Sequence, residues 1–396
     1  MNKLRITLAS FLAYFVMSAV ISPLGIVTAP ISGHYDIPIT TATAGFSYLT
    51  AGILVGTLVS LVIFDLFRLK DIVLCCSGLT CMSLACIYVV DIYLFFPVWL
   101  FLAGLACGVN LTAALVVITS IYNVRLRASM MLLTDSFYSM AGVLSTWLAG
   151  KFILHQLHWS SAYLLAFLVA LVITLIAWFS SFPSTSRRES RQLDGGAGKY
   201  WPMEIFLLGA AILIYLMGFV TIYSWIPNFT QARFSLDADM AGGLVSRLFL
   251  GMFIGQLIMF CLALKLAPAR IIFTAAVLAT LLSFSLWNVD SASRLTICMF
   301  ILGLVTGGLL KLIIAFGTML MSVPTPRMIS FLIFNSALGT AIAPALSAVI
   351  VEKYGMIAAL QFTSICYCLM LVLLFGAYLL RRRAPESGDV VNEPAF

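Results

Sequence analysis

Apolar residues fill twelve long runs along the 396-residue chain, and polar residues are confined mostly to the short stretches between them. The runs lie near 6–28, 42–65, 72–90, 94–121, 130–153, 161–182, 203–225, 242–264, 271–289, 294–321, 328–351 and 357–380. Most have about 20–25 residues, enough at 1.5 Å per residue to cross the ~30 Å hydrocarbon core of a bilayer. The pattern predicts an all-α membrane protein with twelve transmembrane helices.

The amino-acid composition is not that of a soluble protein. Hydrophobic residues make up 62% of the chain and charged residues only 9%, with a mean hydropathy of +1.10. Soluble domains carry about a quarter charged residues. The net charge of +7 resides in connections and tails, so we expect a lipid bilayer rather than nucleic acid as the partner. The nine cysteines fall in apolar runs at spacings that suit neither a disulfide framework nor a metal site, and we expect no cofactor.

The distribution of Lys and Arg predicts the topology. Sixteen of the 22 basic residues fall in connections on the side of the N-terminus and four on the other side, while Arg247 and Lys311 lie within runs. Short cytoplasmic loops are enriched in Lys and Arg, so both termini are predicted to be cytoplasmic. The first apolar run continues to about Thr28, which favours an uncleaved helix over a signal peptide.

Short patterns recur at an offset of about 199 residues, which predicts two related halves of six helices each. The recurring pairs are Phe101–Gly108 with Phe300–Gly307, Gly52 and Gly56 with Gly251 and Gly255, and Asp135-Ser136 with Asn335-Ser336. We therefore expect an N-terminal half at 1–182, a cytoplasmic linker at 183–202, a C-terminal half at 203–383 and a cytoplasmic tail at 384–396.

Two parallel six-helix halves joined by a basic central loop resemble the major facilitator superfamily. The stretch Leu61–Lys70 keeps Asp65, Arg68 and Lys70 of that superfamily's gating loop but lacks its glycines. Further stretches are similar to the TsgA family of this superfamily: Leu133–Gly142, Ser224–Pro227, Ala241–Ser246 and Ile350–Glu352.

The resemblance implies a monomeric, multi-pass permease of the bacterial inner membrane that binds a small-molecule solute. It also implies that spans 1, 4, 7 and 10 line the transport path, that spans 2, 5, 8 and 11 lie between the halves, and that the others face lipid. The resemblance does not identify the solute.

Charges within apolar runs are costly, so each is a candidate for function. Asp135 is the candidate proton carrier, and the alternative is a structural acid bonded to Ser136 or Ser139. Lys311 and Arg247 are candidates for substrate binding, and Lys311 is expected at a depth similar to that of Asp135, where the two can pair. The weaker candidates for substrate binding are Asn110, Asn335, Tyr14 and Tyr215. The i, i+3 pair His155 and His158 lies in a connection, where a solvated loop is favoured over a metal site.

These features favour a secondary active transporter driven by protons, which works by alternating access around a site near the membrane midplane. The excess of intramembrane positive charge favours a small organic anion as solute, and a sugar permease is the alternative. An uncoupled facilitator and a membrane sensor that does not transport also remain open. The chain lacks a large catalytic loop, a Cys/His cluster inside the spans and a phosphate-binding loop, so we do not expect an enzyme.

Overall fold

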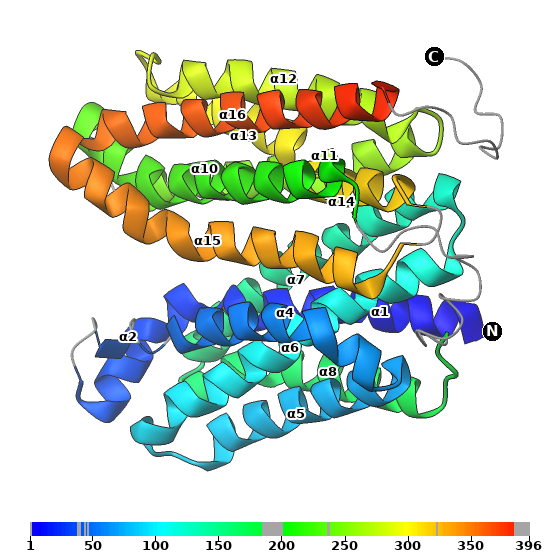
Figure 1. Ribbon diagram of the computed structural model, residues 1–396. Coiled ribbons are helices and arrows are strands. Elements are labelled where there is room, and N and C mark those ends of the chain that lie inside the picture. Colours follow the sequence, from blue (N-terminus) through cyan, green and yellow to red (C-terminus); the bar gives the residue numbers. More distant parts are fainter. Residues whose placement is uncertain are drawn as a thin grey trace.

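The computed structural model describes residues 2–37, 41–42, 45, 47–183, 201–235, 238–321 and 324–383, which form helices joined by short connections (Figure 1). The expected linker and tail fall almost entirely on residues outside these ranges.

The first six spans form the N-terminal half. They are α1 (Asn2–Ile21) continued by α2 (Leu24–Tyr35), α4 (Ser47–Leu66), α5 (Leu69–Val89), η1 (Tyr93–Phe95) with α6 (Phe96–Ile121), α7 (Val124–Leu154), and η2 (Trp159–Tyr163) with α8 (Leu164–Trp178). The other six spans form the C-terminal half. They are α10 (Met203–Phe234), α11 (Ala238–Ala263), α12 (Pro268–Leu286), α13 (Ala292–Thr306) with α14 (Leu309–Met319), α15 (Pro326–Tyr354) and α16 (Met356–Arg383).

The prediction of an all-helical protein with twelve spans is confirmed. Eleven spans of the described chain are long and apolar enough, by length and composition, to cross a membrane. The remaining one is α7, which has 31 residues and packs against both α1 and α11. Its serines, its threonines and Asp135 dilute its hydropathy. It begins six residues earlier than expected because Asn123 caps it, its Oδ1 accepting from the N–H of Leu126 at 3.2 Å.

Glycines allow paired spans within each half to approach closely. A Cβ added at Gly52 or Gly56 of α4 would collide with the backbone carbonyl of Phe101 or Leu105 on α6. The same collisions recur 199 residues later, where Gly251 and Gly255 of α11 face the carbonyls of Phe300 and Leu304 on α13. The recurring glycines therefore form packing surfaces on which backbone meets backbone.

The two halves lie side by side, and the start of α1 and the end of α16 lie at the same end of the bundle (Figure 1). We call this the terminus-bearing end. Between the halves, α7 packs against α11 and α4 packs against α15. Four polar contacts that cross this boundary lie between the middle of the bundle and the terminus-bearing end. These contacts join the halves on the side of the termini.

Candidate functional site

A buried ion pair joins the two halves near the middle of the bundle. Nζ of Lys311, on α14, lies 3.0 Å from Oδ1 of Asp135, on α7. The Lys311 side chain is 4% exposed and the Asp135 side chain 15% exposed, so the carboxylate keeps some access to solvent. The lysine ammonium also lies 4.5 Å from the centre of the Tyr14 ring on α1, within the range of a cation–π interaction. The site therefore draws on spans 1, 5 and 10.

Asp135 is unusual among the acids of the described helices. It is the eleventh residue after the start of α7, whereas every other acid in these helices lies within three residues of a helix end. The two serines considered as its partners bond elsewhere. The hydroxyl of Ser136 donates to the carbonyl of Leu132, and that of Ser139 donates to Oε1 of Gln256. Lys311 is accordingly the partner that compensates the charge of Asp135.

Lys311 follows a break in span 10. The helix stops after Thr306 and resumes at Leu309, with Gly307 and Gly308 between the two segments. The pattern predicted one continuous span here, as the structure shows for α6 in the N-terminal half. The difference is local, because the second glycine has no counterpart in α6, where Val109 occupies the corresponding position.

Two side chains satisfy the backbone carbonyls that this break frees. The Tyr215 hydroxyl of α10 donates to the carbonyl of Thr306 at 3.0 Å, and Nε2 of Gln256 donates to that of Gly307 at 3.2 Å. Such bonds let irregular backbone exist inside a membrane. Tyr215 therefore supports the break, and its hydroxyl is already bonded to backbone.

Gln256 was not singled out from the sequence, although the uncharged Asn110 and Asn335 were. It is an uncharged polar residue on α11, almost fully buried, and it connects Ser139 of the N-terminal half to the broken span of the C-terminal half. The available signal was its position directly after Gly255, on a helix expected between the halves. Together Tyr14, Asp135, Gln256 and Lys311 form what we call the central cluster.

A second ion pair joins the halves at the terminus-bearing end. Asp65, at the end of α4, pairs with Arg327, at the start of α15. Beside it, the Ser330 hydroxyl donates to the carbonyl of Ser60 at 2.9 Å. This contact closes that end of the boundary.

The other two residues of the expected gating loop do not reach across. Arg68 is exposed and precedes the first residue of α5. Lys70 donates to the carbonyl of Trp178, which belongs to the same half. Only Asp65 of the three connects the halves, and its partner Arg327 was not singled out from the sequence.

Arg247 does not join the central cluster. It is exposed on α11, nine residues before Gln256. Nine residues make two and a half helical turns, so Arg247 lies on the opposite side of the helix from the residue that faces α7.

The two asparagines also lie away from the central cluster. Asn110 of α6 borders a cavity of about 10 Å³ inside the N-terminal half, which has room for one water molecule and not for a solute. Nδ2 of Asn335 donates to the carbonyl of Phe331 one turn earlier on α15. In this conformation neither is placed to contact a solute at the central cluster.

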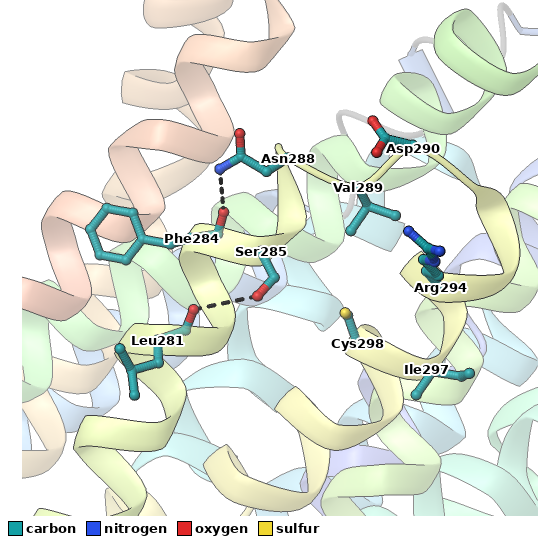
Figure 2. A pocket seen from close by; sticks show the side chains of 9 residues that line it. All are labelled: Leu281, Phe284, Ser285, Asn288, Val289, Asp290, Arg294, Ile297 and Cys298. Atoms are coloured by element: carbon teal, nitrogen blue, oxygen red, sulfur yellow. Dashed lines mark hydrogen bonds between the residues drawn. The ribbon is translucent and has the colours of Figure 1, made fainter.

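A pocket with a volume of about 560 Å³ lies elsewhere (Figure 2). It is formed by one end of α12, the start of α13 and the connection between them, with Asp290 and Arg294 at its rim. Its lining includes Leu281 and Ile297, whose side chains are exposed on the outside of the half. None of its lining residues belongs to the central cluster, so we do not assign it to the transport path.

Protonation changes the charge of the central cluster. With Asp135 ionised, the pair with Lys311 is neutral. With Asp135 protonated, the ammonium of Lys311 is left uncompensated in a setting where removing one partner of a buried pair costs about 3–5 kcal/mol. An anion or a strong acceptor that entered at that moment would restore the balance. The arrangement can therefore link the arrival of a proton to the binding of a second species.

Comparison with known proteins agrees with this architecture. Residues 6–246, more than half of the chain, match the profile of the Major Facilitator Superfamily. The TsgA homolog of Yersinia enterocolitica is 26% identical over 372 residues, which cover 94% of both chains. The TsgA homolog of Yersinia pestis is 25% identical with the same coverage.

Solved structures share the fold at low sequence identity. The Escherichia coli fucose:proton symporter FucP matches with a TM-score of 0.74 at 13% identity, covering 95% of this chain and 99% of that one. The proton:xylose symporter XylE matches with a TM-score of 0.78 at 10% identity, covering 95% of each chain. The human organic anion transporter MFSD10 matches with a TM-score of 0.73 at 14% identity, covering 94% of this chain and all of that one. With its profile match, its two halves and its twelve spans, the chain belongs to the major facilitator superfamily and has the multi-pass membrane fold of that superfamily's transporters.

Proposed function

We propose that this protein is a proton-driven secondary transporter of a small polar solute in a bacterial inner membrane, with both termini in the cytoplasm. The excess of Lys and Arg in the connections at the terminus-bearing end supports the orientation. The TsgA homologs of Yersinia support the bacterial setting. Two of the structural neighbours are described as proton symporters, which supports the coupling.

The observation that carries the proposal is the Asp135–Lys311 pair between the halves. A lone lysine near the middle of a span costs about 2.5–3.5 kcal/mol on insertion scales, so its retention calls for a role. A pair that served only to hold one half together would lie within that half. This pair instead joins two bodies that must move apart during alternating access.

The proposed cycle begins from the conformation in which the terminus-bearing end is closed by Asp65 and Arg327. A proton from the outside neutralises Asp135, which still has some solvent access, and this releases Lys311. The solute then binds at the central cluster against the freed ammonium. The halves part at the cytoplasmic end, the solute and the proton leave, and the pair forms again.

We propose a small organic anion as the solute, because the cycle frees a cation, Lys311, at the moment of binding. The case for an anion is weaker than the sequence suggested, because Arg247 lies away from the central cluster and Lys311 is the one cation that the cluster contains. Two sugar symporters among the structural neighbours favour the alternative. For a sugar, Gln256 and Tyr14 would supply the polar and aromatic contacts, and Lys311 would serve coupling alone.

The test is uptake of a panel of labelled organic anions and sugars into proteoliposomes, with and without an imposed proton gradient. We expect a carboxylate-bearing solute to accumulate above its external concentration only when the gradient is present. Uphill accumulation of a sugar would support proton-driven transport but would contradict the proposal that the solute is an organic anion. Equal uptake with and without the gradient would identify an uncoupled facilitator, and uptake of no solute would favour a sensor that does not transport.

A further inference from the structure

Two of the three histidines converge on one aspartate at the end of the bundle opposite the termini. His34 lies in the last turn of α2, Asp91 in the connection between α5 and η1, and His158 directly before η2. One ligand atom from each residue lies within 4.8 Å of those of the other two. We propose that His34, Asp91 and His158 form a binding site for a divalent transition metal ion of the Zn²⁺ type.

The residue types and distances suit such an ion. Imidazole nitrogen and carboxylate oxygen are ordinary zinc ligands, bound at about 2.0–2.2 Å. Two ligands at that distance in tetrahedral geometry are about 3.4 Å apart. Nε2 of His34 lies 2.8 and 2.9 Å from the two oxygens of Asp91. To bind a metal, the distance between His34 and Asp91 would have to increase slightly, and His158 would have to move closer to both. All three side chains are accessible to solvent.

Ser160 holds one of the ligands in place. Nδ1 of His158 lies 2.6 Å from the hydroxyl of Ser160 and 3.4 Å from its backbone nitrogen, which leaves Nε2 of that ring for a metal. Coordination through Nε2 requires the tautomer in which Nδ1–H donates to the hydroxyl, in place of the one in which Nδ1 accepts from the backbone N–H of Ser160. The rings of His34 and His158 meet edge to face with their centres 4.9 Å apart.

Three protein ligands leave the fourth position to water or to another exogenous ligand. A bound ion would tie the end of α2, which continues span 1, to the connections that follow α5 and α7. The site lies entirely within the N-terminal half and does not depend on the proposed transport cycle. The sequence favoured a solvated loop for His155 and His158. His155 is exposed, and the ring of His158 lies 4.9 Å from that of His34, a residue that the sequence did not connect with it.

The test uses the purified full-length protein, stripped of metal with a chelator and titrated with Co²⁺ and with Zn²⁺. We expect one ion per chain, with a cobalt spectrum typical of nitrogen and oxygen ligands. His34→Gln, Asp91→Asn and His158→Gln should each weaken binding by at least about tenfold, the lower end of the loss seen when even an outer-shell partner is removed. The matched control is His155→Gln, which removes the third histidine in the same connection and should bind as the wild type does.

A second readout guards against variants that fold poorly. Zn²⁺ should raise the thermal unfolding midpoint of the wild type and of His155→Gln but not those of the three ligand variants. Three outcomes overturn the site: no binding by the wild type, binding unchanged in the ligand variants, or a cobalt spectrum with thiolate charge-transfer bands, which would place the ion on the free cysteines.

Discussion

Asp135→Asn is expected to abolish uphill accumulation while sparing exchange of solute across the membrane. The amide keeps the size of the side chain and one accepting oxygen but cannot bind and release a proton. One pH unit is worth about 1.4 kcal/mol per proton, so one-to-one coupling gives about tenfold accumulation in the wild type. In the variant, the internal solute concentration should rise to the external concentration and not above it. The measurement is gradient-driven uptake and counterflow in matched proteoliposomes.

The matched control is Asp71→Asn, which removes an exposed acid in the first turn of α5, away from the central cluster. Its accumulation should equal that of the wild type. Undiminished accumulation in Asp135→Asn would eliminate this carboxylate as the proton carrier. Loss of exchange together with accumulation would instead indicate that Asp135 acts in binding or folding.

Breaking the central ion pair from either side should strongly destabilise the folded protein in the conformation described. Asp135→Asn leaves the Lys311 ammonium buried without a counter-charge, and Lys311→Met does the same to the carboxylate. Removal of one partner of a buried pair costs about 3–5 kcal/mol, whereas removal of both can be nearly neutral. We therefore expect each single variant to lower stability by about that amount and the double variant to recover most of it.

A double-mutant cycle on thermal or denaturant unfolding in detergent measures this coupling. Additive losses in the double variant would show that the two side chains do not compensate each other. The larger loss is expected for Asp135→Asn, because the Lys311 side chain is the more buried of the two.

The spans were predictable from the sequence because a membrane imposes one length and one polarity on every crossing segment. The recurrence of the glycines also followed from the sequence, since Gly52 and Gly251 lie at a fixed offset, but the helices that they pack against came only from the structure. The break in span 10 was not visible, because a pair of glycines within an apolar run fits a continuous helix as well as an interrupted one. Whether it breaks depends on partners elsewhere, here Tyr215 and Gln256.

The site was only partly predictable. Asp135 and Lys311 could be singled out from the sequence, because a charge within an apolar run is rare and costly. Arg247 was selected on the same ground, but the sequence does not show which face of α11 packs against α7, and so it does not show where the Arg247 side chain points. Arg327 and Gln256 were missed because the sequence does not state which of many polar residues meets a partner in the other half.

The central claim is that protonation of Asp135 breaks its pair with Lys311 and lets the halves part at the terminus-bearing end. Spin labels on Val124→Cys and Leu264→Cys, at the start of α7 and just after α11, span the boundary there. Both positions are exposed, and the nine native cysteines are first replaced. The measurement is the distance distribution between the labels by pulsed electron paramagnetic resonance, with and without Asp135→Asn as a mimic of the protonated carboxyl. A shift of population toward longer distances in Asp135→Asn, absent in Asp71→Asn, is the predicted result, and an unchanged distribution would contradict the account.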